Sequence, residues 1–209
     1  MKPTDWDHYY RQPYKLNTIL KRIVTRRLMR YIRRYVPQDK AFSILEFGGG
    51  NSCFFDIFDQ TFQPTTYYIV DNNRLGLDAL HNRSGNRRSL VLLHRDMMEP
   101  GLNIECDLVF SVGLIEHFSP EDTRKAILAH LQAVKKGGIL ILGFPTPTFL
   151  YRVARKVSEL LGQWIFHDER PLKTQEVASH LTSSCSILDS GIVWPIIFTQ
   201  AFIVAKKNE

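Results

Sequence analysis

Two short stretches of the sequence hold residues that could bind a nucleoside. The glycine-rich stretch 46–51 (Glu-Phe-Gly-Gly-Gly-Asn) follows the apolar run Phe42–Leu45, and the second apolar run Tyr67–Asp71 ends in an acid. Glycines are needed where a chain reverses sharply and where backbone approaches a ligand, because a Cβ would clash. A carboxylate after the next strand suits a ribose diol, since it accepts hydrogen bonds from both hydroxyls. The pattern predicts a strand, a glycine turn, a helix and a second strand around a nucleoside-containing cofactor.

The glycine turn departs from the pattern that binds dinucleotides. That pattern has a third glycine for close packing of helix on strand, whereas Asn51, Ser52 and Cys53 follow Gly50 here. A nicotinamide oxidoreductase of similar topology would also need a catalytic Tyr-Lys or His pair, which we cannot place. A pyrophosphate site is therefore disfavoured.

The acid two residues before Gly48 makes this stretch resemble the first motif of class I S-adenosylmethionine-dependent methyltransferases. In that family the glycine loop lies against the amino-acid moiety of the cofactor, and the acid after the second strand holds the ribose. The resemblance implies S-adenosylmethionine as cofactor and S-adenosylhomocysteine as product. From this motif it assigns cofactor binding to Glu46, Gly48, Gly49, Gly50, Asp71 and Asn72.

Later segments follow the same family in order and spacing. The run Ser89–His94 predicts a third strand, after which the family places an acid near the adenine; Asp96 matches that acid, and Met97 could pack on the adenine face. Asp107–Gly113 predicts a fourth strand, and the resemblance gives its Ser111 and Gly113 to the cofactor site. Five elements in register carry more weight than any single motif.

The second half of the sequence contains clear helix and strand signals. Ser119 is a predicted N-cap, with Pro120 in the first turn. The run 135–138 (Lys-Lys-Gly-Gly) is expected to close that helix, and Ile139–Phe144 to form the fifth strand. Thr174–Thr182 predicts a short helix. Two strands, Ile187–Trp194 and Thr199–Lys206, are joined through Pro195 and must pair antiparallel because their connection is short.

These elements define the expected fold. It is an α/β, Rossmann-like three-layer α/β/α sandwich with a seven-stranded, mostly parallel sheet and an antiparallel C-terminal hairpin edge. With 209 residues and 44% hydrophobic content, the chain suits a single catalytic domain. We expect an N-terminal aromatic segment and basic amphipathic helix over 1–40, and a methyltransferase domain over 41–209 with a cap insertion at about 145–172. Neither a signal peptide nor a bilayer-spanning stretch is evident, so a cytoplasmic location is expected.

Positive charge is concentrated at the start of the chain. Residues 1–40 carry a net charge of +8, whereas the whole chain carries +6. Apolar residues recur at helical period from Leu16 to Tyr35, with most Lys and Arg on the opposite side. Such a helix either packs on the sheet with a solvated cationic face, or uses that face to bind an anionic acceptor or the inner membrane surface peripherally. Nucleic acid is disfavoured, because the place after the fourth strand lacks an Asn/Asp-Pro-Pro-aromatic motif.

Candidate acceptor-side residues lie in three places. His117 is the first candidate general base, since imidazole titrates near neutral pH and follows the fourth strand; its neighbour Glu116 is a candidate substrate ligand. His167 is the second candidate base, and Arg170 could hold a carboxylate or phosphate. Tyr9 and Tyr10 belong to an aromatic segment that could close over the site as a lid.

A metal site is not expected. Some quinone-pathway O-methyltransferases bind magnesium through a Glu-His pair and an acid three residues before it, and Gly113 stands at that place here. Three widely spaced cysteines suggest neither a disulfide framework nor a thiolate zinc site.

The sequence therefore predicts an S-adenosylmethionine-dependent methyltransferase for a small-molecule, sugar or lipid-linked acceptor, with O-methylation favoured. Two alternatives stay open: a cofactor-binding module or partner subunit without turnover, and an RNA methyltransferase.

Overall fold

Seven strands form one mixed sheet in the computed structural model, which describes residues 3–11, 18–194 and 199–209. The order across the sheet is β3-β2-β1-β4-β5-β7-β6. The first five strands pair in parallel, and β7 pairs antiparallel with both β5 and β6. This arrangement confirms the predicted fold. The strands are β1 (Ile44–Phe47), β2 (Tyr67–Asp71), β3 (Leu90–His94), β4 (Cys106–Val112), β5 (Val134–Pro145), β6 (Cys185–Trp194) and β7 (Gln200–Lys207).

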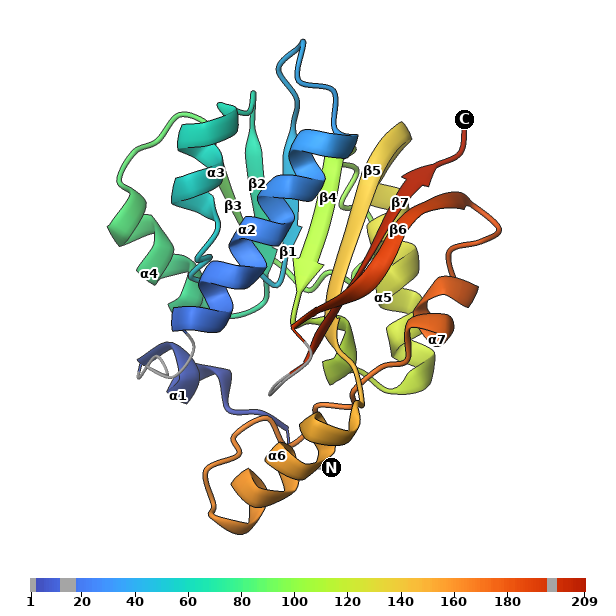
Figure 1. Cartoon of the computed structure of the whole chain (residues 1–209). Coiled ribbons are helices and arrows are strands. Elements are labelled where there is room, and N and C mark those ends of the chain that lie inside the picture. Colours follow the sequence, from blue (N-terminus) through green and yellow to red (C-terminus); the bar gives the residue numbers. More distant parts are fainter. Residues whose placement is uncertain (1–2, 12–17, 195–198) are drawn as a thin grey trace.

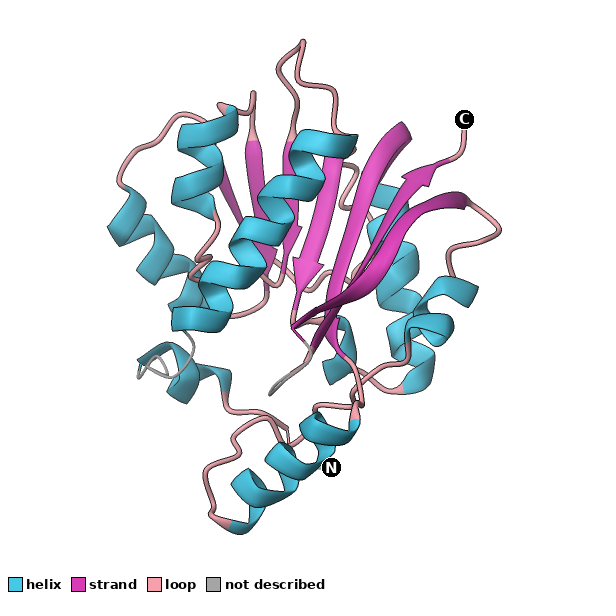
Figure 2. Cartoon of the chain, in the orientation of Figure 1, coloured by secondary structure: helices cyan, strands magenta, loops and turns pink. Residues whose placement is uncertain are grey.

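Helices cover both faces of this sheet and one of its ends (Figures 1 and 2). The N-terminal helix α1 and the helix after β5, α6, lie beyond the edge where the parallel strands end (Figure 1). The helices are α1 (Trp6–Arg11), α2 (Thr18–Tyr35), α3 (Phe55–Phe62), α4 (Arg74–Ser84), α5 (Pro120–Ala133), α6 (Phe149–Leu160) and α7 (Thr174–Ser179), together with the 3₁₀ turn η2 (Ile115–His117).

The alternation of side chains along each strand divides the core into two layers. Ile44 packs in a buried cluster with residues of α2, α3 and α4, whereas the next residue, Leu45, packs with residues of α5 and α7 on the other face. Neighbouring residues of a strand point to opposite faces of the sheet, so continuous apolar strands need helices on both sides. The three-layer sandwich is thus a direct consequence of fully apolar strands such as β1.

The helix after β4 begins as predicted but ends differently. The Ser119 hydroxyl accepts a hydrogen bond from the Asp122 amide at 3.1 Å and caps α5. The run 135–138 does not close this helix: α5 ends at Ala133, and the run lies within β5. Val134 is already extended and pairs with Cys106, with a register irregularity before the next pair. Pairing with β4 outweighs the glycine signal, so the predicted helix stop was wrong.

Other element boundaries shift by a few residues. Within the predicted cap, helix α6 ends at Leu160, and Gly162 soon follows with a φ of +65°. The last helix ends at Ser179 rather than Thr182. Leu16 and Pro195, at predicted helix and hairpin positions, lie outside the described residues. Among the described helices, none combines the length and apolar character needed to cross a membrane.

Candidate functional site

The glycine turn after β1 is held against the end of β2. Gly48 and Gly50 have φ values of +69° and +23°, which explains the need for glycine at both positions. The Gly48 amide donates to the Val70 carbonyl at 2.8 Å, and the Gly50 amide donates to the Asp71 carboxylate at 2.7 Å. The turn and the acid therefore form one preorganised unit at the carboxyl edge of the sheet.

Asp71 is a buried carboxylate with hydrogen-bonding capacity to spare. Besides the Gly50 amide it accepts a hydrogen bond from the Asn73 amide at 2.7 Å. Burial raises its pKa, although these backbone amides oppose that effect. A carboxylate has about four lone-pair sites, so two remain after these amides, and both become open to ribose hydroxyls only when the Tyr10 hydroxyl moves away. The Tyr10 hydroxyl now forms a hydrogen bond with this carboxylate.

Glu46 supports the glycine turn from beneath. Its buried carboxylate accepts hydrogen bonds from the Ser52 hydroxyl at 2.7 Å and the Tyr67 hydroxyl at 2.8 Å. The Ser52 oxygen in turn accepts from the amides of Phe54 and Phe55 at the start of α3. Burial raises the pKa of Glu46 to about 8. These bonds give Glu46 a positioning role for the turn, and its direct contact with the cofactor stays a prediction.

The remaining predicted cofactor residues divide into surface and core positions. Asn72 and Asp96 are exposed after β2 and β3, and the Asp96 carboxylate accepts from the Met98 amide at 2.8 Å. Met97 is buried in the core cluster of the α5 face. Ser111 is fully buried, with its hydroxyl 2.9 Å from Nε2 of His130, and its role at the cofactor stays a prediction.

A cavity of about 280 Å³ lies where the parallel strands end. Its wall combines the N-terminal helix α1, the start of α2, the end of β4, the η2 turn and the segment from α6 to Glu169. Most of the lining side chains are apolar or aromatic. They include Trp6, Tyr9, Phe54, Tyr151, Trp164 and Phe166. Gly113, one of the predicted cofactor residues, also lines this cavity.

His117 forms a dyad with an acid far away in sequence. Its Nδ1 lies 2.8 Å from an Asp168 carboxylate oxygen, and the Trp6 ring packs edge-on against the imidazole at a centroid distance of 4.9 Å. Burial lowers the pKa of His117, and Asp168 only partly opposes this. We assign the Nδ1 proton to the bond with Asp168, so the neutral imidazole presents Nε2 as an acceptor.

The N-terminal segment is attached to the same acid. Both the amide and the hydroxyl of Thr4 donate to the Asp168 carboxylate, the amide at 3.0 Å. Burial works to raise the pKa of Asp168, but the bonds from Thr4 and His117 outweigh it and hold the pKa below its usual value. One carboxylate therefore joins the N-terminal segment, the cap after α6 and the imidazole.

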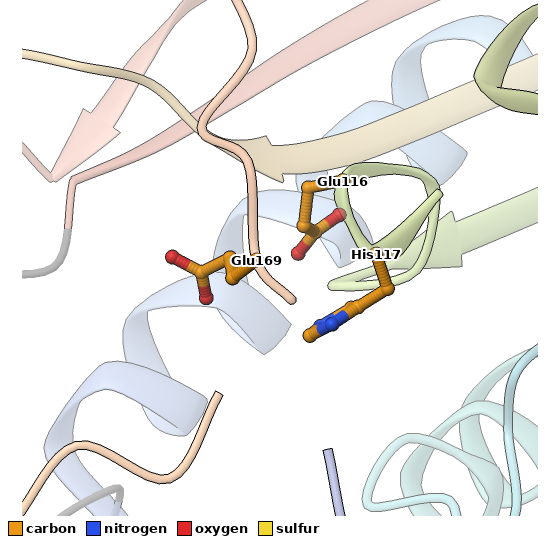
Figure 3. A group of neighbouring side chains, drawn as sticks. All are labelled: Glu116, His117 and Glu169. Atoms are coloured by element: carbon orange, nitrogen blue, oxygen red, sulfur yellow. The ribbon is translucent and has the colours of Figure 1, made fainter. Parts of the chain in front are cut away.

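Two further acids, Glu116 and Glu169, lie near the His117 imidazole (Figure 3) and also line the cavity. Burial, followed by the charge of Glu169, raises the pKa of Glu116 well above its usual value, and one Glu116 oxygen is buried without a hydrogen-bond partner. Burial raises the pKa of Glu169 to about 7, although its carboxylate accepts a hydrogen bond from the Tyr151 hydroxyl. Glu116, His117 and Glu169 offer ligand atoms within 4.8 Å of one another, which could hold a cation. Glu169 thus provides a third acidic or imidazole ligand beside Glu116 and His117, where the related magnesium site would use an acid at position 113. The expectation that no metal binds stays a prediction.

Two of the predicted acceptor-side residues lie elsewhere. His167 is exposed and does not line the cavity. The Arg170 guanidinium donates to Glu176 at 2.7 Å and to the Thr123 hydroxyl at 3.2 Å, and its role as an anion ligand stays a prediction. Sequence reasoning missed Asp168 and Glu169, the neighbours of these two residues. The dense polar run 167–170 was the available signal, but it did not show which members point inward.

Comparisons with known proteins agree with this geometry. Residues 45–142 match the family model described as a methyltransferase domain. Magnesium protoporphyrin IX methyltransferase from Synechocystis PCC 6803 with bound S-adenosylhomocysteine superimposes with a TM-score of 0.76 at 13% identity, covering 97% of this chain and 93% of that chain. The N-methyltransferase NodS from Bradyrhizobium japonicum WM9, also with S-adenosylhomocysteine, gives 0.67 at 13% identity, covering 88% and 87%.

A third similar structure is an S-adenosylmethionine-dependent methyltransferase from Clostridium acetobutylicum, with a TM-score of 0.68 at 15% identity and 98% of each chain covered. No curated protein sequence matches the chain. The sheet order, the glycine turn bound to Asp71, the matched domain and the cofactor-bound structures all agree. Residues 45–142 therefore match a methyltransferase domain, and the whole chain has the fold of class I S-adenosylmethionine-dependent methyltransferases.

Proposed function

We propose that the protein methylates a hydroxyl group of a small or lipid-linked acceptor, with His117 as the general base. The observation that carries this proposal is the His117–Asp168 bond of 2.8 Å in the wall of an aromatic cavity next to the cofactor edge. A hydroxyl is a weak nucleophile at neutral pH and benefits from a base within reach, whereas a neutral amine has less need of one. The dyad therefore favours oxygen over nitrogen.

The residues at the glycine turn fit the cofactor. Asp71 offers two acceptor sites to a ribose diol once the Tyr10 hydroxyl moves away, and the same movement would free the space beside Gly50 for a ligand. When bound, S-adenosylmethionine supplies a methyl group on a sulfonium, which is a good leaving group. The protein mainly aligns the donor and the acceptor and excludes water.

At the acceptor, the proposed proton path involves two side chains. Nε2 of His117 would take the proton of the acceptor hydroxyl as that oxygen is methylated. Asp168 holds the imidazole in the required tautomer and stabilises the imidazolium that forms. The aromatic wall, including Trp6 and Phe166, packs around this position and limits access of water.

The charges near His117 refine the acceptor. Glu116, Asp168 and Glu169 all lie beside the imidazole, and Arg170 is engaged with Glu176. An anionic group next to the reacting hydroxyl would face the ionised Asp168 carboxylate, so we propose a neutral hydroxyl at that end. Lys21 lines the cavity as well and offers a cation for a charged group elsewhere on the acceptor.

A labelled-methyl screen of nucleotide sugars, glycans, lipid-linked sugars, quinone precursors and total RNA tests this proposal. On the accepted substrate, His117→Gln should lower kcat about 10² to 10⁴-fold, as expected for loss of a general base. His167→Gln is the matched control, because it removes an exposed imidazole from the neighbouring segment and should leave turnover unchanged. Full activity of the His117 variant would exclude the base. Cofactor binding without any transfer would favour a silent module, and transfer to RNA alone would favour the RNA alternative.

A further inference from the structure

Helix α6 exposes an apolar stripe that the rest of the chain does not cover. Of the large apolar side chains that are exposed in the described residues, half belong to α6 and the residue after it. Their exposed fractions run from 46% for Val153 to 78% for Phe149 and Leu160. At helical spacing they lie along one side of the helix. The α6 stripe consists of Phe149, Leu150, Val153, Val157, Leu160 and Leu161.

The opposite side of α6 is firmly attached to the protein. Tyr151 is buried and donates its hydroxyl to Glu169. The Arg155 guanidinium donates to the Glu169 carbonyl at 2.8 Å and lies over the Trp164 ring. Tyr151 and Ser158 also line the cavity. The helix is therefore fixed by its inner side, and the α6 stripe is its outer side, pointing away from the cavity.

Two cations adjoin the stripe. Arg152 and Lys156 are exposed, lie one turn apart on α6, and form no ion pair with any residue that the structure describes. More exposed arginines without ion pairs among the described residues lie on α2, namely Arg22, Arg26 and Arg30, and the whole chain carries a net charge of +6. An apolar stripe beside Lys and Arg is the pattern of helices that lie in the interface of a membrane.

From these observations we infer that α6 docks in the surface of an anionic lipid bilayer, with its stripe among the acyl chains and Arg152 and Lys156 at the headgroups. A second copy of the chain fits this face less well, because association through the stripe would bring the cations of both copies together. The sequence predicted a membrane contact through the basic helix α2, whereas this inference places the contact at α6. The cations of α2 would add attraction to the anionic headgroups. It stands on the surface of α6 and is independent of the proposed reaction.

Co-sedimentation of the 209-residue protein with vesicles tests this inference without cofactor or acceptor. We expect binding to phosphatidylcholine vesicles with about one third phosphatidylglycerol, and much weaker binding to phosphatidylcholine alone. Phe149→Glu with Leu160→Glu should lower the partition coefficient at least about tenfold, because each change places a charge among the acyl chains. Leu128→Glu on α5 is the matched control: it alters a leucine that is 43% exposed and should leave binding unchanged.

A second pair of variants separates the two parts of the contact. Arg152→Gln with Lys156→Gln should remove most of the preference for phosphatidylglycerol and its sensitivity to salt. Wild-type protein that fails to bind these vesicles, or a Phe149/Leu160 variant that binds like wild type while keeping its circular dichroism melting curve, would overturn the inference. So would a dimer in sedimentation velocity that Leu160→Glu dissociates, since that result assigns the stripe to a second copy. A failure in methyl transfer leaves vesicle binding unaffected, so the two proposals fail separately.

Discussion

At the scale of single residues, the site depends on carboxylates whose surroundings give them different tasks. Asp168 is stabilised as an anion by donors from Thr4 and His117, whereas burial raises the pKa of Glu116 and Glu169. An ionised acid next to an imidazole raises its basicity, and a neutral acid beside it adds no charge. Because only Asp168 is ionised, His117 can stay neutral near pH 7 while its bond to Asp168 orients it for proton transfer.

The pH dependence of turnover should reflect His117. Because burial lowers its pKa below the usual 6.5, the neutral base should already predominate at pH 7. The value of kcat/KM should therefore rise with pH to a plateau, with a midpoint below about 6.5. Steady-state rates from pH 5 to pH 8 would show this limb. His117→Gln should remove it, and a midpoint above 7 would contradict a depressed pKa.

Tyr10 supports a second prediction at this scale. Its hydroxyl is bound to Asp71 and fills the space that a side chain at Gly50 would need. Binding of a ribose diol to Asp71 would displace this bond. Tyr10→Phe should therefore tighten binding of S-adenosylhomocysteine about two- to tenfold, the size of one hydrogen bond.

Isothermal titration calorimetry would measure this affinity. Tyr35→Phe is the control, because the Tyr35 hydroxyl donates to Asp189 on β6, away from the cofactor edge. Weaker binding by the Tyr10 variant would instead show that the hydroxyl contacts the cofactor.

At the scale of elements, a buried imidazole joins β4 to α5. Nδ1 of His130 lies 2.7 Å from the Ala126 carbonyl within α5, and Nε2 accepts from the Ser111 hydroxyl of β4. The Phe47 ring at the end of β1 packs edge-on against the same imidazole at 4.7 Å. A neutral histidine satisfies both polar partners with one donor and one acceptor, whereas a protonated ring would have to reverse the Ser111 bond and would place a charge in the buried core. The contact between the elements therefore favours the neutral form.

Stability should consequently decrease in mild acid. Burial lowers the pKa of His130 to about 4, below the unfolded value of 6.5. The unfolded chain then binds the proton more tightly, so this contribution to stability is complete above pH 6.5 and is lost as the pH falls toward 4. Between pH 7 and pH 5 the free energy of unfolding should fall by up to about 2 kcal/mol from this group.

Urea unfolding at the two pH values measures this loss. His130→Gln should show a smaller difference between pH 7 and pH 5, whatever its absolute stability, because an amide does not titrate there. His81→Gln, an exposed substitution on α4, should keep the wild-type difference. Equal losses in wild type and the His130 variant would contradict the assignment.

At the scale of the whole molecule, local patterns determined most of the fold. The apolar runs before Gly48 and Asp71 are strands, and the Ser119 cap starts a helix, because these signals depend on neighbours in sequence. The run 135–138 failed because strand pairing with Cys106 competes with the glycine signal. Site residues were harder to predict: Asp168 and His117 are 51 positions apart and meet only through the path of the cap. The sequence suggested His167 as a second base, whereas in the structure its neighbour Asp168 is the residue that contacts His117.

The shared carboxylate of Asp168 has a consequence for the timing of the reaction. Because Tyr10 of α1 is bound to Asp71, we expect that exchange of a nucleoside at this acid would require α1 to lift, which would break the Thr4 bonds and withdraw the Trp6 ring from the imidazole. The open molecule would then have a poorly aligned proton acceptor when bulk water enters. Alignment would return on closure, so we expect the methyl donor to be protected from hydrolysis during loading and release.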